Sequence, residues 1–272
     1  MTSVAAALAA ARVKLPASEG RLLLGQVLGR PTPWLIAHDD AVLDETALLS
    51  FASLVARRAG GEPVAYLIGF REWFGREFAV SPAVLIPRPE TELLVELALA
   101  SLSPGESPRI LDMGTGSGCI AITLALERPQ AQVSAVDISE AALAVARRNG
   151  GQLGGHVRFL QSDWFAALTG ERFDLIVANP PYIAASDPHL VEGDLRHEPT
   201  GALSSGADGL DAIRHIVAAA PVHLAPGGQL WLEHGYDQAE AVSELLAAAG
   251  LVDIHRHRDL AGIVRVSGGQ LR

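Results

Sequence analysis

Asn179, Pro180, Pro181 and Tyr182 are the residues best suited to do chemistry, and they directly follow the apolar run 173–178. The two prolines fix φ and remove backbone donors, and Pro180 pushes Asn179 toward an extended conformation. The turn is therefore stiff, so its oxygens can be aimed. The Asn179 side-chain oxygen and the Pro180 carbonyl can accept both hydrogens of a planar amine and favour the pyramidal, nucleophilic nitrogen. Tyr182 would add an aromatic ring face against the substrate or near the positive charge of a methyl donor. An ordinary turn that leaves a sheet is the alternative.

A glycine-rich loop is the second candidate site. Residues 109–113 form a short apolar run typical of a buried strand, and residues 114–118 then read Gly-Thr-Gly-Ser-Gly. A helical pattern follows over 119–127. Glycine lets a backbone approach a ligand closely, and open α/β sheets bind ligands at the carboxyl ends of their strands. We therefore expect a nucleotide-like ligand at this loop.

Two further strand ends offer groups for an adenosine. The expected strand 132–136 ends at Asp137, 19 residues after the last glycine of the loop, which suits hydrogen bonds to ribose hydroxyls. The strand 157–161 leads to Asp163 and Trp164, which can bind the adenine amine and cover its ring. The G-x-G-x-G spacing argues against NAD, because the dinucleotide fingerprint places its third glycine one residue later. An adenosine-containing methyl donor beside an amine-binding turn indicates an N-methyltransferase.

The elements that must position these residues alternate between helix and strand from about residue 91, the pattern of a doubly wound, mostly parallel α/β sheet. The last two expected strands, about 252–258 and 262–266, are close enough in sequence to form an antiparallel hairpin at the sheet edge. All the candidate residues lie in this part of the chain.

The first part of the chain has a different pattern. Residues 1–70 read as short helices separated by proline and glycine, and residues 72–80 read as a hairpin that turns at Gly75. We predict a helical substrate-recognition domain over 1–70, a β-hairpin connector over 71–85 and a catalytic domain over 86–272.

These motifs resemble the HemK/PrmC family of class I S-adenosylmethionine-dependent methyltransferases. The resemblance covers nearly the whole chain and rests on residues 62–69, 86–92, 111–118, 161–165, 179–183 and 227–233. It implies a Rossmann-like, mostly parallel seven-stranded sheet with a small N-terminal helical bundle. It also implies S-adenosyl-L-methionine as cofactor, and methylation of the glutamine amide in the Gly-Gly-Gln motif of peptide chain release factors.

The resemblance also implies roles for individual residues. The cofactor-binding set that we expect is Gly114, Thr115, Gly116, Ser117, Gly118, Asp137, Asp163, Trp164 and Asn179. The catalytic set is Asn179, Pro180, Pro181 and Tyr182, which would bind the glutamine amide. Residues 87–89 would close one side of the pocket, or else only frame the start of a helix near Thr91.

Charge narrows the choice of partner. The 272 residues carry a net charge of −10, and residues 1–75 hold seven acidic and seven basic side chains, so the acidic excess belongs to the rest. A composition this acidic lacks the excess of basic side chains that is typical of general nucleic-acid binding. We therefore expect no direct nucleic-acid contact and disfavour adenine methylation in DNA or RNA. A ribosomal-protein glutamine methyltransferase and a catalytically silent cofactor-binding module stay as alternatives.

Composition also bears on location and metals. The single cysteine, Cys119, excludes an intrachain disulfide, suits a reducing compartment and is interpreted as a packing residue. The nine histidines show no metal-ligand spacing, and we expect no metal. No apolar run has membrane-spanning length, and residues 4–11 read as a helix rather than a signal peptide. We expect a cytoplasmic protein with no membrane partner.

Two stretches have less certain roles. Residues 184–208 form a long polar loop after the amine-binding turn, and loops of this length are usually functional or mobile. We expect a substrate-facing flap, with an ordinary insertion as the alternative. The chain itself contains Gly-Gly-Gln at 227–229 and at 268–270. The first fits a turn before a strand, whereas the second is expected in a flexible tail and is interpreted as a coincidence.

Overall fold

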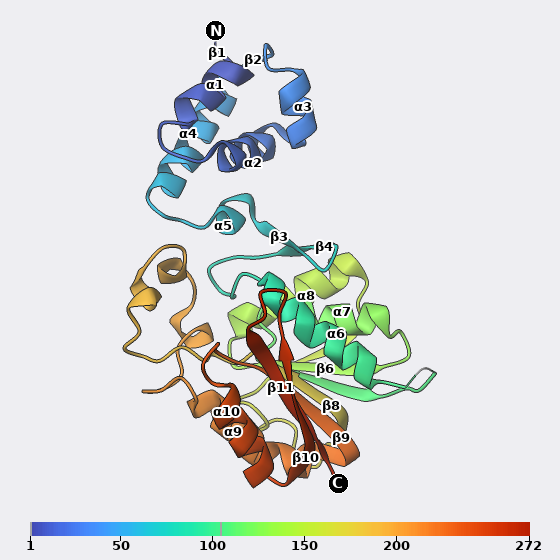
Figure 1. Cartoon of the computed structure of the whole chain (residues 1–272). Helices are drawn as coiled ribbons and strands as arrows, with labels where there is room; N and C mark the ends of the chain where they lie inside the picture. Colours follow the sequence, from blue (N-terminus) through green and yellow to red (C-terminus); the bar gives the residue numbers. More distant parts are fainter. Residues whose placement is uncertain (1, 104) are drawn as a thin grey trace. The chain divides into compact units, whose positions relative to one another are not determined.

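The protein, seen in a computed structural model, is described over residues 2–103 and 105–272. These residues form two compact units, with the boundary between Phe70 and Arg71 (Figure 1). Each unit contains its own cluster of buried apolar side chains, which is the property expected of a domain. The segment 71–85 belongs to the second unit.

The first unit is helical. Its elements are α1 Val4–Ala11, α2 Ala17–Leu28, α3 Thr32–Ala37, α4 Glu45–Ala59 and α5 Val64–Ile68, with a short antiparallel pair of β1 Thr2–Ser3 and β2 Val42–Leu43. The Ser3 hydroxyl caps α1 by accepting from the Ala6 N–H at 3.2 Å. The Arg58 guanidinium donates to Glu19 at 2.7 Å and so joins α4 to α2. The predicted helical bundle is therefore confirmed.

In the second unit, residues 105–272 contribute seven strands to one sheet in the order β10-β11-β9-β8-β5-β6-β7. The strands are β5 Arg109–Met113, β6 Gln132–Asp137, β7 Val157–Gln161, β8 Phe173–Ala178, β9 Leu224–Glu233, β10 Leu251–Arg258 and β11 Val264–Leu271. Strands β5 to β9 pair in parallel, and β11 is antiparallel to both of its neighbours. The predicted doubly wound, mostly parallel sheet is confirmed.

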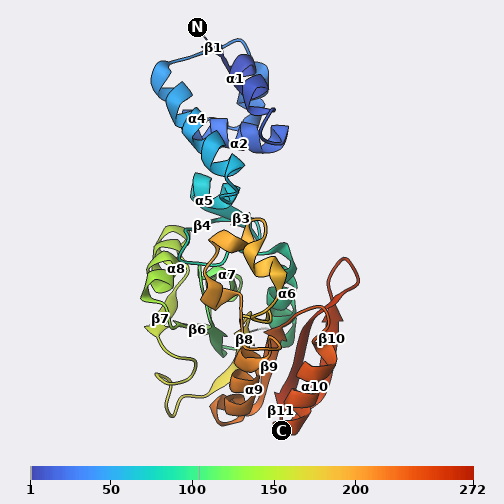
Figure 2. The same ribbon diagram turned by 90° about the vertical axis from the view of Figure 1, so that its left-hand side faces the viewer.

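Helices cover both faces of this sheet (Figures 1 and 2). The helices α6 Glu92–Ser101, α7 Cys119–Glu127 and α8 Glu140–Leu153 lie on one face, and α9 Asp211–His223 and α10 Ala239–Ala248 lie on the other. Successive residues of β8 alternate between the two layers: Leu175 and Val177 pack with α6 and α7, whereas Ile176 and Ala178 pack with α9 and α10. A strand buried on both faces explains why β8 is apolar at every position except the exposed Asp174.

A hairpin opens the second unit. Strands β3 Phe70–Trp73 and β4 Arg76–Ala79 turn at Phe74 and Gly75, whose φ angles are 49° and 68°, as predicted for Gly75. The Trp73 indole N–H donates to the Arg88 carbonyl at 2.7 Å, and the Phe74 N–H donates to the Glu92 carboxylate at 2.9 Å. These bonds fix the hairpin to the segment that leads through the 3-10 turn η1 Pro89–Thr91 into α6.

The carboxyl-terminal strand corrects one expectation. Gly268-Gly269-Gln270 was expected in a flexible tail, but it lies within β11, between β9 and β10. A Cβ on Gly268 would lie 2.2 Å from the Trp231 ring, so glycine here makes room for a tryptophan. The Gln270 amide donates to the Gly227 carbonyl at 2.8 Å. Because the triplet is paired on both sides, it cannot enter another active site unless β11 first loses its pairing with β9 and β10.

Candidate active site

The sheet reverses its winding direction at β5, which pairs with β6 on one side and with β8 on the other. The carboxyl ends of these parallel strands lie at one edge and carry Gly114, Asp137 and Asn179. A reversal of this kind leaves a crevice where α/β proteins bind ligands. The topology thus gathers the three motifs that the sequence singled out.

The glycine loop takes a shape that only glycine adopts easily. Gly114, Gly116 and Gly118 have φ angles of 71°, 54° and 82°, in the left-handed region that strains other residues. The N–H groups of Gly114 and Thr115 both donate to the Val136 carbonyl at 2.9 Å. The loop is therefore held against the end of β6.

Asp137 is fixed by the same loop. Its Oδ2 accepts from the Gly116 N–H at 2.9 Å, and its Oδ1 accepts from the Ser139 N–H at 2.9 Å. Each carboxylate oxygen has a further lone pair, and the residue is only partly buried, so hydroxyl donors can still reach it. Ile138 follows with 66% of its surface exposed, which supplies an apolar surface beside the carboxylate.

Two buried polar residues that sequence reasoning missed brace the loop from beneath. The Asp112 carboxylate accepts from the Thr115 hydroxyl at 2.6 Å and from the Ala121 N–H at 3.2 Å, and burial raises its pKa to about 7. The Asn149 amide, on α8, donates to the Ser117 carbonyl at 2.8 Å. Asp112 had a sequence signal, a lone carboxylate in an apolar run, whereas nothing near Asn149 in sequence marks it.

Trp164 lies near the start of the loop. A Cβ on Gly114 would be 4.0 Å from the Trp164 ring, and the backbone of Trp164 is left-handed, with a φ of 48°. The Ser162 hydroxyl donates to the Trp164 carbonyl at 2.7 Å, and the Ser162 N–H donates to the Asp137 carbonyl at 3.0 Å. Asp163 is exposed. The turn therefore places an aromatic ring beside the loop and leaves the neighbouring Asp163 exposed.

Buried groups hold the turn of residues 179–182 from below. The Asn179 side-chain nitrogen donates to the Thr91 hydroxyl at 3.1 Å, and the Tyr182 hydroxyl donates to Glu233 Oε1 at 3.2 Å. Glu233 is 1% exposed, and burial raises its pKa to about 7. Burial and the neighbouring Glu233 carboxylate raise the pKa of Tyr182, so the phenol stays neutral. Thr91 and Glu233 lay within the resembling stretches but were not among the expected site residues.

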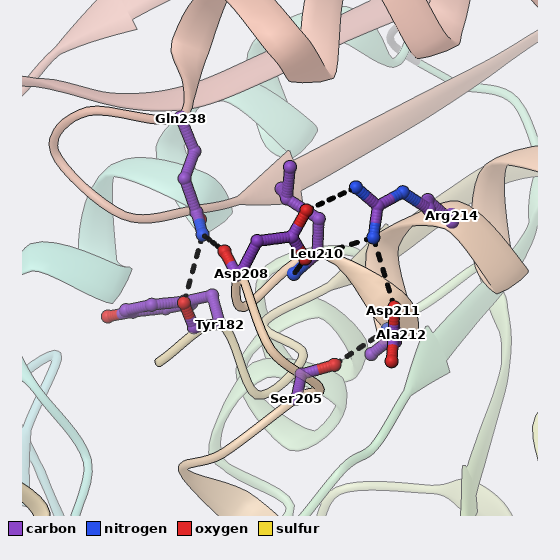
Figure 3. Close-up of polar contacts among 8 residues, drawn as sticks. All are labelled: Tyr182, Ser205, Asp208, Leu210, Asp211, Ala212, Arg214 and Gln238. Carbon is purple, nitrogen blue, oxygen red and sulfur yellow. Dashed lines mark hydrogen bonds and ion pairs between the residues drawn. The ribbon is translucent and has the colours of Figure 1, made fainter. Parts of the chain in front are cut away.

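A set of hydrogen bonds, called here the clamp, holds the end of the turn to the loop 184–208 and to Gln238. The N–H of Ile183 donates to the Leu203 carbonyl, and that of Ala185 to the Gly206 carbonyl. Figure 3 shows the Gln238 amide between two backbone carbonyls, that of Tyr182 at 3.0 Å and that of Asp208 at 3.3 Å. The far end of the long loop is thus fastened to the turn.

The loop 184–208 contains the 3-10 turns η2 Pro188–Val191, η3 Leu195–His197 and η4 Thr200–Ala202. Glu198 is buried within it, accepts from the Ile86 N–H at 3.0 Å and forms an ion pair with Arg88. The predicted pocket wall at 87–89 and the predicted flap are therefore joined by one carboxylate. A hollow of about 440 Å³ lies between Arg88 and residues 189–195. Whether the flap faces a substrate stays a prediction.

Other reactive groups are inert or dispersed. Burial raises the pKa of the Cys119 thiol to about 12, so the interpretation as a packing residue agrees with the structure. Among residues 2–103 and 105–272, no three His, Cys, Asp or Glu side chains gather in a way that could hold a metal ion. Over the same residues, no helix is both long and apolar enough to cross a bilayer.

The sheet order and the glycine loop at its winding reversal define a class I methyltransferase fold. A methyltransferase from Pyrococcus furiosus is similar in structure, with a TM-score of 0.55, 20% identity and coverage of 72% of this chain and 89% of that one. Family models match as well: "PrmC N-terminal domain" over residues 1–69 and "Methyltransferase small domain" over residues 89–197.

Two relatives specify the family. The release factor glutamine methyltransferase of Burkholderia pseudomallei is 57% identical over 94% of this chain and 93% of its own length. That of Bordetella pertussis is 55% identical over 94% of this chain and 96% of its own. This chain belongs to the release factor glutamine methyltransferase family.

Proposed function

We propose that this protein transfers the methyl group of S-adenosylmethionine to the glutamine side-chain amide of a Gly-Gly-Gln motif in peptide chain release factors. The observation that carries the proposal is the orientation of Asn179. Its amide nitrogen is bound to Thr91, so its oxygen is left to accept a hydrogen from the substrate amide. The names of the close relatives support the choice of substrate.

The residues at the strand ends fit the methyl donor. The positive φ angles of the loop and the exposed Gly114 allow close approach of a ligand. Asp137 would accept from the ribose hydroxyls, Ile138 and Trp164 would cover the adenine, and Asp163 would accept from its amine. When bound, S-adenosylmethionine would supply a methyl group made electrophilic by its sulfonium. The transfer would release S-adenosylhomocysteine and one proton from the amide nitrogen.

The catalytic turn prepares the nucleophile. A carboxamide nitrogen is weakly nucleophilic because its lone pair is delocalised into the carbonyl. The Asn179 oxygen and the Pro180 carbonyl accept its two hydrogens in the geometry of a pyramidal nitrogen, and fixed acceptors of this kind stabilise a transition state without reorganisation. Tyr182 offers a neutral ring, since its hydroxyl is occupied by Glu233.

The direct test uses the full chain with labelled S-adenosylmethionine and a purified release factor, beside the same factor with its Gly-Gly-Gln glutamine replaced by alanine. Label in the first factor and none in the second is the expected result. A parallel reaction contains ribosomal proteins in place of the release factor, and label there but in neither factor would favour a ribosomal-protein glutamine methyltransferase. The acidic composition does not support adenine in DNA or RNA as the methyl acceptor. Because translation factors act in the cytoplasm, we propose that this protein works there too.

Asp137→Ala should weaken the binding of S-adenosylmethionine by about 1–3 kcal/mol, the usual cost of lost hydrogen bonds to a charged group. Titration calorimetry measures this directly. Asp174→Ala is a matched control, because Asp174 also accepts a backbone N–H, from Arg109 at 2.7 Å, but at the opposite end of the sheet. An unchanged dissociation constant in Asp137→Ala would remove Asp137 from the cofactor site.

Deletion of residues 1–70 should spare cofactor binding and reduce methylation of the intact release factor by about 10²-fold or more, as expected when a recognition surface is lost. The physical reason is the separate core of the helical unit, which contains no part of the catalytic turn. A short peptide containing Gly-Gly-Gln is the matched substrate, and both proteins should methylate it equally. Full activity of a folded truncated protein on the intact factor would contradict a recognition role.

A further inference from the structure

Gln238 is a buried amide side chain that the proposed chemistry has not yet used. It stands directly before α10, and its carbonyl begins that helix by accepting from the Val242 N–H at 2.9 Å. Val242 is fully buried in the apolar core, so the base of the side chain is fixed. The residue is 8% exposed, and a buried amide requires hydrogen-bond partners.

The partners of this amide determine its orientation. The Gln238 oxygen accepts from the Gly235 N–H at 2.8 Å, and a backbone N–H can only donate. The Gln238 nitrogen donates to the carbonyls of Tyr182 at 3.0 Å and Asp208 at 3.3 Å (Figure 3). The reverse orientation would place an oxygen against two carbonyl oxygens. Gln238 therefore binds the end of the catalytic turn in one way only.

Two glycines bring the backbone close to the same amide. A Cβ on Gly235 would lie 3.0 Å from the Gln238 oxygen, and a Cβ on Gly209 would lie 2.8 Å from the Gln238 nitrogen. Any side chain at either position would therefore crowd the amide. Because both neighbours are glycines, the amide fits between the backbone segments that it joins.

The peptide between Tyr182 and Ile183 is held on both sides. Gln238 binds its carbonyl, and its N–H donates at 2.9 Å to a carbonyl of the loop 184–208. The other end of the turn is held by the hydrogen bond of the Asn179 side chain at 3.1 Å. Between these two anchors the two prolines have fixed φ angles. Few torsions remain free, so the anchors decide where the Pro180 carbonyl points.

We propose, resting on the proposed function, that Gln238 is a positioning residue for methyl transfer: by holding the Tyr182 carbonyl, it aims the Pro180 carbonyl at the substrate amide. Its second acceptor, Asp208, ties the same amide to α9, because the Asp208 carboxylate accepts from the Arg214 guanidinium at 3.0 Å. Without the Gln238 amide, the Tyr182 peptide can rotate and the Pro180 carbonyl leaves its position opposite the amide hydrogen.

The first test is Gln238→Met in the full-length chain, which keeps the length of the side chain but cannot donate. Its kcat with release factor should fall by about 10²-fold, the effect of displacing a reacting group by about 1 Å. The dissociation constant of S-adenosylmethionine, measured by calorimetry, should stay native, because the glycine loop and Asp137 follow other strands. A folded Gln238→Met enzyme with native kcat would overturn the proposal.

Gln270→Met is the matched control. The Gln270 amide also donates to a backbone carbonyl, that of Gly227 at 2.8 Å, but at the opposite end of the sheet. This variant should keep native turnover. An equal loss of kcat in Gln270→Met and Gln238→Met would show that any broken amide contact slows the enzyme, and would overturn a specific role for Gln238.

Gln238→Glu separates positioning from packing, because it replaces one nitrogen by an oxygen. The charged carboxylate would repel the Tyr182 and Asp208 carbonyl oxygens, whereas the protonated carboxyl can donate to one of them again. Burial raises the pKa of such a carboxyl above its usual value. The ratio of variant to native kcat should therefore be low at about pH 8 and rise as the pH falls toward about 6.

The ratio isolates the effect of this one side chain. Once folding is checked by circular dichroism at each pH, a loss of packing alone would lower kcat by the same factor throughout. A ratio that does not change with pH would therefore overturn the proposal. The ionisable groups next to the clamp are the same in both proteins, so their own titrations cancel: Asp208 with Arg214, Asp237 and His234.

A further readout does not need methyl transfer. In Gln238→Met, the Ile183 N–H should exchange with deuterium about 10-fold faster than in the native chain, because its peptide has lost one of two anchors. The N–H groups of Gly114 and Thr115, in the cofactor loop, should exchange as in the native chain. If the native chain methylates no release factor but Ile183 responds as described, the proposed function fails and the structural link stands. Unchanged exchange at Ile183 would overturn the link.

Discussion

Asn179→Ala should lower kcat by about 10²–10³-fold, the usual loss when one fixed polar contact to a transition state is removed. Affinity for S-adenosylmethionine should be largely retained, because most of the expected cofactor contacts lie elsewhere, on the glycine loop, Asp137 and Trp164. Single-turnover rates at saturating cofactor and release factor measure the effect, with folding checked by circular dichroism. A near-native rate would reduce Asn179 to a turn residue.

Asn179→Asp is the matched variant, since it keeps the shape and an acceptor oxygen. It should retain more activity than Asn179→Ala but less than the native chain, because it loses the N–H that binds Thr91 at 3.1 Å. Both ends of a carboxylate accept, so its orientation no longer matters. A single-turnover rate in Asn179→Asp no higher than that of Asn179→Ala would mean that the side-chain oxygen is not what binds the substrate amide.

Gly209→Ala should lower kcat by about 10²-fold, the effect of displacing a reacting group by about 1 Å. A Cβ at this position would lie 2.2 Å from the Tyr182 carbonyl oxygen and 2.8 Å from the Gln238 amide nitrogen. Either the clamp opens or the catalytic turn shifts (Figure 3). The loss should appear in turnover with the release factor, and cofactor affinity measured by calorimetry should change little.

Gly170→Ala separates this clash from backbone strain. Gly170 and Gly209 have φ angles of 77° and 79°, but nothing lies within 4 Å of a Cβ at Gly170. Gly170→Ala should lose about 1–2 kcal/mol in thermal unfolding, the cost of a left-handed alanine. Gly209→Ala should lose at least as much because of its added clash, and only Gly209→Ala should lose turnover. Equal activities in the two variants would show that the clamp at Tyr182 does not position the turn.

The sequence predicted the parts of the site that are local in the chain. The glycine loop, Asp137 and the turn at Asn179 each directly follow a strand, and parallel strands bring their carboxyl ends to one edge. The strands, loops and helices that carry these residues could therefore be predicted from apolar runs and glycine spacing. The doubly wound, mostly parallel arrangement of the sheet followed from the same alternation of helix and strand.

The groups that orient those residues could not be predicted in this way, because they come from distant elements. Asn179 and Thr91 are 88 residues apart, Tyr182 and Glu233 are 51 apart, and Tyr182 and Gln238 are 56 apart. Only the fold brings each pair within hydrogen-bonding distance. The Gly-Gly-Gln of residues 268–270 misled for a related reason: glycine in a strand looks like a breaker until its packing partner, Trp231, is known.

The position of β11 bears on how the protein is made. Because β11 lies between β9 and β10, β9 keeps an open edge during synthesis until residues 264–271 leave the ribosome. An unpaired edge next to apolar surface invites association with other chains. Val266 of β11 pairs with Glu233, and the Arg265 carbonyl accepts from the His234 N–H at 3.0 Å. The contacts of β11 with Glu233 and His234, which lie next to the catalytic turn, therefore form only after the residues of the turn have been translated. A ribosome stalled before residue 264 would hold a chain that contains the proposed catalytic residues but lacks these contacts.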